Sequence, residues 1–179
     1  MKHILIVVDM QNDFVDGVLG SPEAVAILPA VTDKIEGHEG KIIFTRDTHG
    51  EDYMNTREGK YLPVPHCIEG TKGWEIKDEV WSAAKGKPSV EIIDKPTFGS
   101  TRLSELLIQL HEQGLVETVT LIGVCTDICV ISNAMLIKAA LPEIDVVVDA
   151  ACCAGVTPQS HENALSAMAV CQIIVENKL

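Results

Sequence analysis

The chain has 179 residues, enough for one sizeable hydrophobic core and too few for two ordinary domains, so we expect a single domain over residues 1–179. Hydrophobic residues make up 46% and charged residues 22%, a globular composition, and the net charge of −12 comes without a basic cluster that could bind nucleic acid. The apolar runs are too short for a signal peptide or a membrane span, so we expect a cytoplasmic protein with no nucleic-acid or membrane partner.

Six short apolar segments predict the strands of a sheet. Most of them are continuously apolar rather than alternating, which is typical of a parallel sheet with helices on both faces. In chain order they are His3–Asp9, Lys41–Arg46, Val90–Asp94, Thr118–Gly123, Asp145–Asp149 and Gln172–Glu176.

Helices are predicted between the later strands. Residues 100–113 carry leucines at helical spacing, and Pro158–Val170 has an amphipathic pattern. Asp127–Ala140 is apolar on nearly every side, which predicts burial against the sheet or against a second subunit. Strands that alternate with helices imply right-handed βαβ units, so we expect an α/β fold, a three-layer doubly wound sheet of about six parallel strands.

One long loop interrupts this regularity and carries possible metal ligands. Residues 47–73 are rich in Gly, Pro, Asn and Thr, and a loop of this length is usually functional or disordered. Asp47, His49 and His66 offer one carboxylate and two imidazoles, which suit Zn²⁺ best, with Mn²⁺ or Fe²⁺ possible. Glu58 is a possible fourth ligand. The alternative is that Asp47 caps a turn while the two histidines are ordinary surface residues.

Three reactive side chains follow three different predicted strands: Asp9, Lys95 and Cys129. In a doubly wound sheet the carboxyl ends of the strands share one edge, so an acid, an amine and a thiol should meet there. Cys129 is predicted in the first turn of a helix, where free N–H groups favour a thiolate. Taken singly, each has an ordinary explanation: a capping carboxylate, a solvated lysine and a buried small hydrophobe. Together they have the parts needed for acyl transfer.

The six cysteines are expected to be free thiols. Cys152 and Cys153 are adjacent, and Cys125 and Cys171 lie in or beside apolar segments. This spacing suits buried thiols in a reducing compartment better than a secreted disulfide framework.

Several motifs spread over nearly the whole chain resemble those of the isochorismatase-like cysteine hydrolases, and among these the nicotinamidases most nearly. The matching residues are Val8 to Phe14, Arg46 to His49, His66 to Thr71, Lys95 with Phe98, and Gly123 to Val130. The resemblance implies that Asp9, Lys95 and Cys129 form a catalytic triad. It also implies that Asp47, His49 and His66 bind the metal that holds the pyridine nitrogen of nicotinamide, and that the chain forms homo-oligomers.

The resemblance has further implications for the substrate pocket. It implies a cis peptide between Val124 and Cys125, with the backbone N–H groups of Cys125 and Cys129 directed at the oxyanion. Phe14 would stack on the substrate ring, although ordinary core filling would also explain it. Val124 is expected as a second substrate contact.

The chain departs from the nicotinamidase pattern at two places. Tyr61 to His66 lacks the Trp-Pro or Phe-Pro pair that commonly precedes the last metal histidine. After Lys95 the sequence is Phe98-Gly99-Ser100-Thr101 rather than Tyr/Phe-Ser-Ala-Phe. Both changes should reshape the substrate pocket and leave the triad untouched.

The function expected from the resemblance is hydrolysis of a small-molecule amide, nicotinamide, to nicotinate and ammonia through a thioester on Cys129. An alternative is that another small amide or a carbamoyl compound is the substrate. Isochorismatase-type hydrolysis of a vinyl ether is less favoured, because it needs neither the thiol nor the metal ligands. A non-catalytic role is also open, in which Cys125 and Cys129 form a redox or metal-binding switch.

Overall fold

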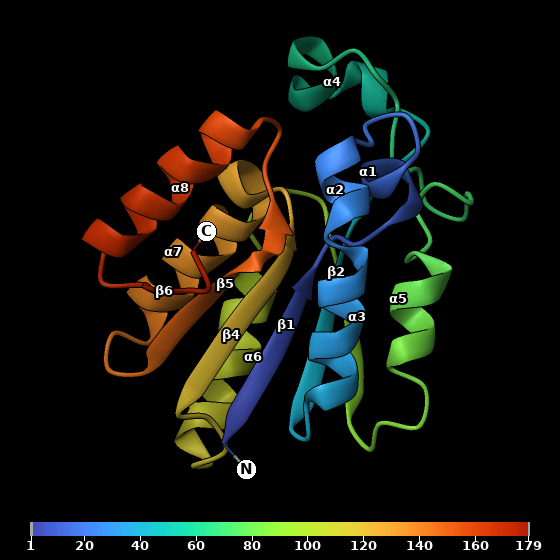
Figure 1. Ribbon diagram of the computed structural model, residues 1–179. Helices are drawn as coiled ribbons and strands as arrows, with labels where there is room; N and C mark the ends of the chain where they lie inside the picture. Colours follow the sequence, from blue (N-terminus) through green and yellow to red (C-terminus); the bar gives the residue numbers. More distant parts are fainter. Residues whose placement is uncertain (1, 179) are drawn as a thin grey trace.

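The computed structural model describes residues 2–178 and has the predicted α/β architecture (Figure 1). All six strands are parallel, and their order across the sheet is β3-β2-β1-β4-β5-β6. The strands are β1 His3–Val8, β2 Lys41–Asp47, β3 Val90–Lys95, β4 Thr118–Val124, β5 Asp145–Ala154 and β6 Ile174–Glu176. The chain therefore winds outward in both directions from β1, as the doubly wound prediction requires.

Helices cover both faces of this sheet (Figure 1). One layer contains α6, α7 and α8, and the other contains α3 and α5, with the short α1 and α2 near the carboxyl edge. The helices are α1 Asn12–Val15, α2 Pro22–Ala26, α3 Leu28–Gly37, α4 Arg57–Tyr61, α5 Asp78–Ala83, α6 Thr101–Glu112, α7 Ile131–Ala140 and α8 Pro158–Val170. Two short segments complete the set, a 3-10 turn η1 at Tyr53–Asn55 and a π-helical turn η2 at Thr126–Val130.

The sheet separates the core into two halves. Successive residues of β1 point to opposite faces, so Ile4 and Ile6 pack with the α6–α8 layer, while Leu5 and Val7 pack with the α3–α5 layer. Both faces are buried, which explains why the strands are continuously apolar in sequence.

Some boundaries differ from the prediction. The fifth strand continues to Ala154, because a register shift in β4 lets Gly123 pair with Cys153 after the regular ladder ends. Cys152 and Cys153 therefore lie within a strand. The helix predicted from Asp127 begins instead with the π turn η2, and helices α1, α2, α3, α4 and α5 were not predicted.

Two further expectations concern the environment of the chain. All six cysteines are free thiols in the structure. Within residues 2–178 there is no helix with the length and apolar character needed to cross a membrane.

Candidate active site

The register of the central strands brings the candidate residues to one edge of the sheet. Val8 pairs with Thr45 on β2 and with Gly123 on β4, so Asp9 follows directly at the carboxyl edge. Asp47 pairs with Lys95 at the ends of β2 and β3. Gly123 has φ +112°, and a Cβ at this position would lie 2.1 Å from the carbonyl oxygen of Val8. A glycine is therefore needed where β4 passes β1 next to Asp9.

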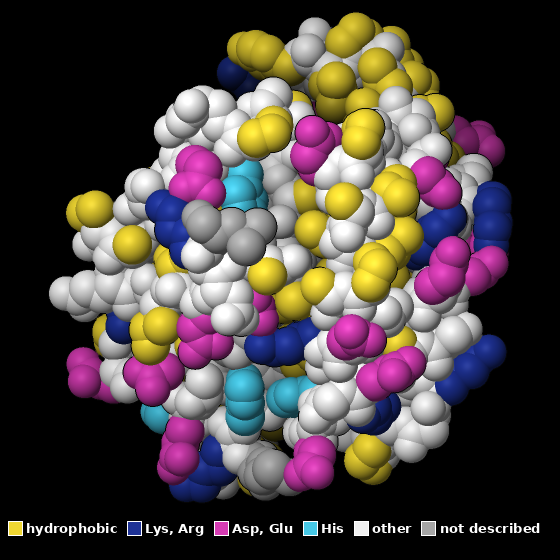
Figure 2. Space-filling view, in the orientation of Figure 1, with side chains coloured by type: hydrophobic (Ala, Val, Ile, Leu, Met, Phe, Trp, Pro, Cys, Tyr) yellow, Lys and Arg dark blue, Asp and Glu magenta, His cyan; other side chains and the backbone are white. Residues whose placement is uncertain are grey.

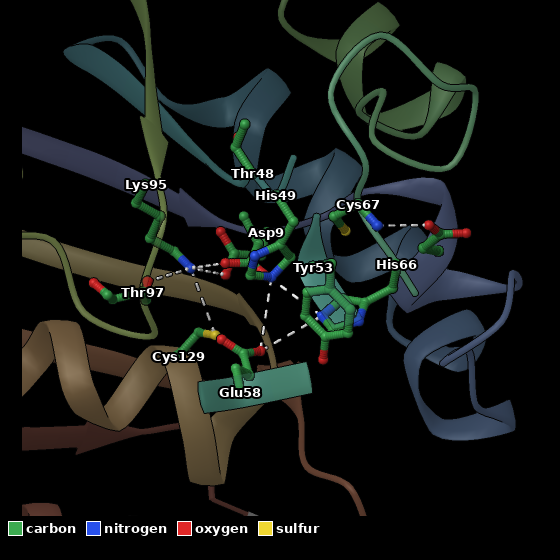
Figure 3. Close-up of polar contacts among 12 residues, drawn as sticks. Asp9, Thr48, His49, Tyr53, Glu58, His66, Cys67, Lys95, Thr97 and Cys129 are labelled. Atoms are coloured by element: carbon green, nitrogen blue, oxygen red, sulfur yellow. Dashed lines mark hydrogen bonds and ion pairs between the residues drawn. The ribbon is translucent and has the colours of Figure 1, made fainter. Parts of the chain in front are cut away.

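Asp9, Lys95 and Cys129 converge in one buried cluster (Figure 3). The Nζ atom of Lys95 lies 2.7 Å from Oδ2 of Asp9 and 3.7 Å from Sγ of Cys129. The structure thus brings together an acid, an amine and a thiol from the ends of β1 and β3 and from the turn η2.

Asp9 is held in place by Thr45. The Thr45 hydroxyl donates to Oδ1 at 2.7 Å, and the backbone N–H of Asp9 donates to the Thr45 carbonyl at 3.2 Å. The other oxygen, Oδ2, forms the ion pair with Lys95 but accepts no hydrogen bond of regular geometry from residues 2–178. Burial raises the pKa of Asp9, against the opposing effect of the Lys95 ammonium. Oδ2 therefore has a free lone pair with which to accept a proton.

Lys95 is an ammonium surrounded by acceptors. Besides Asp9, its Nζ contacts Oδ1 of Asp47 at 3.2 Å and the carbonyl of Thr97 at 3.1 Å. Burial alone would lower the pKa of Lys95, but Asp9, Cys129 and Asp47 together raise it. The side chain can therefore stabilise negative charge at the sulfur without giving up its proton.

The expectation that the fold favours a thiolate at Cys129 was wrong for this structure. The sulfur lies in the π turn η2, and the side chain is only 5% exposed. Burial, followed by the charge of Asp9, raises the pKa of Cys129 well above its ordinary value, and Lys95 offsets this only in part. This environment therefore disfavours the thiolate, and a base beside the sulfur would offset that effect.

The long loop forms a second polar cluster. Asp47, His49, Glu58 and His66 each offer one ligand atom, and these atoms lie within 4.8 Å of one another. Oδ2 of Asp47 is 2.9 Å from Nε2 of His49 and 3.5 Å from Nε2 of His66. Oε1 of Glu58, on α4, is 3.7 Å from both of these nitrogens. Figure 3 shows His49, Glu58 and His66 directed toward one another, next to Lys95 and Cys129.

The chemistry of this donor set fits a divalent cation. The bonds from His49 and His66 hold the pKa of Asp47 well below its usual range although burial opposes them, whereas burial and the charge of Asp47 raise the pKa of Glu58. Nδ1 of His66 lies 2.8 Å from the carbonyl of Val64 and must donate to it, which leaves Nε2 as a ligand atom. Two carboxylates and two imidazoles are a ligand set that zinc, manganese and iron accept.

Gln11 supports the metal cluster from behind and was not identified from sequence. It is 0% exposed, and its side-chain amide bonds both backbone groups of Asp47: Oε1 accepts from the N–H at 2.7 Å, and Nε2 donates to the carbonyl at 2.8 Å. Nε2 also donates to the carbonyl of Trp74 at 2.8 Å. Gln11 lies within the motif Val8 to Phe14, just beyond β1, but the motif does not show what the amide contacts.

Two cavities adjoin these clusters. The inner one, about 240 Å³, is bordered by Cys129 and by Asp47 and His66 of the metal cluster. Its other lining residues are Phe14, Leu19, Glu58, Leu62, Phe98, Cys125, Ile128 and Val156. The outer one, about 450 Å³, is lined by His49, Thr56, Arg57, Glu58, Tyr61, Pro96, Thr97 and Phe98. Glu58 and Phe98 belong to both linings, so they separate the two spaces.

Of the residues expected to contact the substrate, Phe14 and Cys125 line the inner cavity and Val124 does not. The ring of Phe14 borders the inner cavity, with its centroid 5.4 Å from that of His66. The peptide between Val124 and Cys125 is cis, and Cys125 lines the same cavity. The side chain of Val124 is 1% exposed and packs in the core with the α3–α5 layer, so it is not part of this lining.

Comparison with known proteins agrees with this geometry. The sequence model of the isochorismatase domain matches residues 3–177. PncA of Bacillus subtilis (strain 168), named an uncharacterized isochorismatase family protein, is 31% identical over 147 residues, or 75% of this chain and 78% of that protein.

Solved structures give the same result over almost the full length. The crystal structure of nicotinamidase/pyrazinamidase PncA from Bacillus subtilis has a TM-score of 0.82 at 27% identity and covers 98% of this chain and 99% of that one. Pyrazinamidase of Pyrococcus horikoshii in complex with zinc has a TM-score of 0.79 at 28% identity, with 98% of each chain covered. From the family match and the shared architecture it follows that this chain belongs to the isochorismatase family.

Proposed function

We propose that this protein is a nicotinamidase-like cysteine amidohydrolase that converts nicotinamide to nicotinate and ammonia. The observation that carries the proposal is the contact of Lys95 with both Asp9 and Cys129, beside a cavity large enough for a small amide. The names of relatives support the substrate: a nicotinamidase/pyrazinamidase of Mycobacterium tuberculosis is 28% identical over 149 residues, and the two structures above carry related names.

The reaction begins with proton transfer from Cys129 to Asp9. The thiol is the resting form, and Asp9 Oδ2 is the acceptor with a free lone pair, so the carboxylate takes the proton as the sulfur attacks the carboxamide carbon. Lys95 stabilises the charge that passes between sulfur and carboxylate. The backbone N–H groups of Cys125 and Cys129 hold the oxyanion, and the loss of one such donor typically costs about 3–4 kcal/mol of barrier.

The second half of the reaction releases both products. Protonated Asp9 returns the proton to the leaving nitrogen, the carbon–nitrogen bond breaks, and ammonia leaves a thioester on Cys129. Asp9 then takes a proton from a water molecule, whose oxygen attacks the thioester carbon. The carbon–sulfur bond breaks, Asp9 returns its proton to the sulfur, and the released nicotinic acid loses its remaining proton to solvent to give nicotinate.

Asp47, His49, His66 and Glu58 would hold the metal, which we propose to be zinc, with manganese or iron as alternatives. When bound, it supplies a Lewis acid at one end of the inner cavity that can hold a ring nitrogen. On the other walls, Phe14 offers an aromatic face to the ring, and apolar Leu62 and Ile128 exclude water from the sulfur.

Ammonia release from nicotinamide by the purified protein tests the proposal. Cys129→Ala should abolish release, and a rapidly quenched wild-type reaction should contain the chain with one acyl group on the peptide that carries Cys129. Comparable turnover by Cys129→Ala, or the absence of that adduct during turnover, would contradict the covalent route.

A small amide other than nicotinamide is the second candidate substrate. One feature of the cavity wall supports this alternative. The segment before His66 places Leu62 at the inner cavity where nicotinamidases commonly have an aromatic pair nearby. Ammonia release across nicotinamide, pyrazinamide and non-aromatic amides and carbamoyl compounds of similar size separates the two. A preference for the non-aromatic compounds would replace nicotinamide as the substrate and retain the mechanism.

The remaining proposals concern the chain as a whole. We infer that residues 1–179 act as one domain in the cytoplasm, a location supported by six free thiols. We also infer a homo-oligomer, because exposed apolar side chains such as Tyr61 and Leu62 gather over α4 at the top of the molecule (Figure 2). Sedimentation at several concentrations tests the oligomer, and a monomer at all of them would contradict it.

A further inference from the structure

Helix α7 contains one buried side chain whose chemistry differs from that of its neighbours. The helix is apolar on nearly every side, yet Asn133, near its start, is 0% exposed. A buried amide costs free energy unless its donors and acceptor are hydrogen-bonded. The contacts of Asn133 therefore indicate why an amide lies in this position.

Asn133 bonds to the backbone of two separate active-site segments. Its Nδ2 donates to the carbonyl of Cys129 at 2.8 Å and to the carbonyl of Phe98 at 3.2 Å. Its Oδ1 accepts from the N–H of Ser100 at 3.0 Å. A carbonyl can only accept and an N–H can only donate, so these partners fix which way the amide points.

The segment on the far side of Asn133 is the loop from Pro96 to Ser100. It follows Lys95 and carries Phe98, which separates the inner and outer cavities. At its start the ammonium of Lys95 donates to the Thr97 carbonyl at 3.1 Å, and the Thr97 hydroxyl donates to the Gly99 carbonyl at 2.7 Å. At its end the loop is bonded to Asn133.

Close packing against α7 leaves this loop little freedom to move. A Cβ at Gly99 would come within 2.6 Å of a methyl carbon of Leu136 and 3.3 Å of the Cβ of Ser132. Ser100 then caps helix α6 with its own hydroxyl, which accepts from the N–H of Leu103 at 3.1 Å. The amide of Asn133 thus connects the turn of the nucleophile with a short loop that is fixed at both ends.

We propose that Asn133 is a positioning residue that sets the distance between the sulfur of Cys129 and the Phe98 wall of the substrate cavity. It does not touch the reacting atoms and acts through two backbone carbonyls and one N–H. The inference rests on the proposed amide hydrolysis. It adds a residue that holds the nucleophile and the Phe98 wall at a fixed distance from each other.

Two variants separate the contact of Asn133 with Cys129 from its contacts with the loop from Pro96 to Ser100. Asn133→Leu keeps the approximate volume and removes all three hydrogen bonds. Asn133→Ser keeps a hydroxyl that can bond the carbonyl four residues back, that of Cys129, but is too short to reach Phe98 or Ser100. With a small aromatic amide, Asn133→Leu should lower kcat and raise KM, with kcat/KM falling about 10²-fold, as a misplacement of 1 Å can cause. Asn133→Ser should retain most of kcat and raise KM.

Two measurements that need no substrate accompany the kinetics. Hydrogen exchange at the Ser100 amide should become about tenfold faster in both variants, because its acceptor is lost. The rate at which iodoacetamide alkylates Cys129 can be followed by mass spectrometry of the peptide that carries it. This rate should differ from wild type in Asn133→Leu and remain close to wild type in Asn133→Ser. If the wild-type protein hydrolyses no amide, the proposed function fails, and these two measurements still decide the role of Asn133.

Ile137→Val is the matched control, because Ile137 is buried on the same helix and touches neither segment through a hydrogen bond. It should lower stability without changing Ser100 exchange, Cys129 alkylation or the kinetic constants. Wild-type exchange and alkylation in folded Asn133→Leu would overturn the proposal. The same changes in Ile137→Val would also overturn it, because they would then report only weaker packing of α7.

Discussion

The reactive side chains of this site carry their charges where water has almost no access. Asp9 and Lys95 are at most 1% exposed, and Lys95 faces two carboxylates, those of Asp9 and Asp47. This excess of negative charge keeps the lysine protonated and, together with burial, opposes a thiolate at Cys129. In the proposed mechanism the proton of the thiol has to pass to a base during attack, and Asp9 is the base assigned to that step.

Asp9→Asn tests that role. The amide has nearly the same size but cannot take the proton, so kcat for amide hydrolysis should fall about 10²–10⁴-fold, the usual contribution of a general base. Ammonia release at saturating substrate gives kcat, and circular dichroism checks that the variant is folded. Asp16→Asn is the control, since Asp16 pairs with Lys77 at the surface. An Asp9→Asn enzyme within tenfold of wild type would exclude Asp9 as the base.

Phe98→Ala tests the wall between the two cavities. Its ring is 46% exposed and borders both spaces, so its removal should join them and weaken the binding of an aromatic amide. An aromatic contact contributes about 0.5–1.5 kcal/mol, so KM should rise roughly two- to tenfold. The triad is untouched, and kcat should change little. Phe98→Leu keeps an apolar side chain between the cavities, so its KM should lie between those of wild type and Phe98→Ala. An unchanged KM in Phe98→Ala would show that the ring does not contact the substrate.

At the scale of elements, the sequence predicted best what a long apolar pattern determines. Strands β1 to β5 and helices α6, α7 and α8 were predicted because each has a run or stripe of apolar residues that it buries, and the short, largely exposed β6 was predicted from the apolar residues 173–175. Helix α3 was not predicted, since its buried apolar side chains are only Val31 and Ile35, and α5 has six residues. The end of β5 was missed because it consists of alanines and cysteines, which have little strand preference, and pairing with β4 extends it.

Asp149 joins three elements by charge and supplies a test of stability. This β5 residue is 2% exposed, and its carboxylate pairs with Lys34 of α3 at 2.6 Å and accepts from Asn177, after β6, at 2.9 Å. The bonds from Lys34 and Asn177 lower the pKa of Asp149 although burial opposes them. Asp149→Asn should therefore lower the free energy of unfolding at pH 7 by about 1–3 kcal/mol.

The sign of the pH dependence follows from these shifts. A lowered carboxyl pKa in the folded state contributes stability that is present above the unfolded value, near pH 4, and is lost as pH falls through the folded value. The pKa of Lys34 is raised, so the stability that its charge contributes is lost only at strongly alkaline pH. Urea unfolding should thus give wild type a higher free energy of unfolding than Asp149→Asn at pH 7, and the difference should be smaller below pH 3. Glu91→Gln, at a partly exposed pair with Lys41, should have little effect at either pH. An Asp149→Asn effect that does not depend on pH would contradict the pairing of Asp149 with Lys34.

At the scale of the whole molecule, the sequence located the groups that we propose to be catalytic and missed the residues that hold them in place. Asp9, Lys95 and Cys129 could be found because they lie just beyond strands, at the edge where a doubly wound sheet collects them. Gln11, Thr45 and Asn133 could not be found in this way. They act on backbone groups or on another side chain, and each has a partner 33 or more residues away in the chain, as Asn133 has in Ser100.

The long loop shows the same division. Asp47 to Gly73 was predicted as functional, but not its attachment to the segment after β1. There Gln11 bonds the backbone of Asp47, Asn12 donates to the carbonyl of Lys72 at 2.7 Å, and Asp13 accepts from the N–H of Cys67 at 2.8 Å. These bonds hold the loop at both ends, and a metal bound by Glu58 and His66 would add a further connection between its middle and Asp47.

Metal binding should therefore stabilise the whole molecule as well as complete the site. Zinc added to chelator-treated protein at about one hundred times its Kd should contribute about 2.7 kcal/mol, which for a chain of this size raises Tm by roughly 5–10 °C. Thermal unfolding followed by circular dichroism measures this without substrate. Glu58→Gln should reduce the rise by weakening the site, whereas Glu51→Gln, an exposed residue of the same loop outside the cluster, should not.

Comparison of metals extends this test. Manganese and iron(II) should raise Tm less than zinc at equal free concentration, because nitrogen and oxygen ligands bind them more weakly. The metal that restores turnover after chelation need not be the one that binds most tightly, so stability and ammonia release are measured on the same samples. No rise in Tm with any of the three ions, in protein that remains folded, would show that the four side chains do not form a metal site, and the substrate ring would then have to be held by Phe14 and the apolar wall alone.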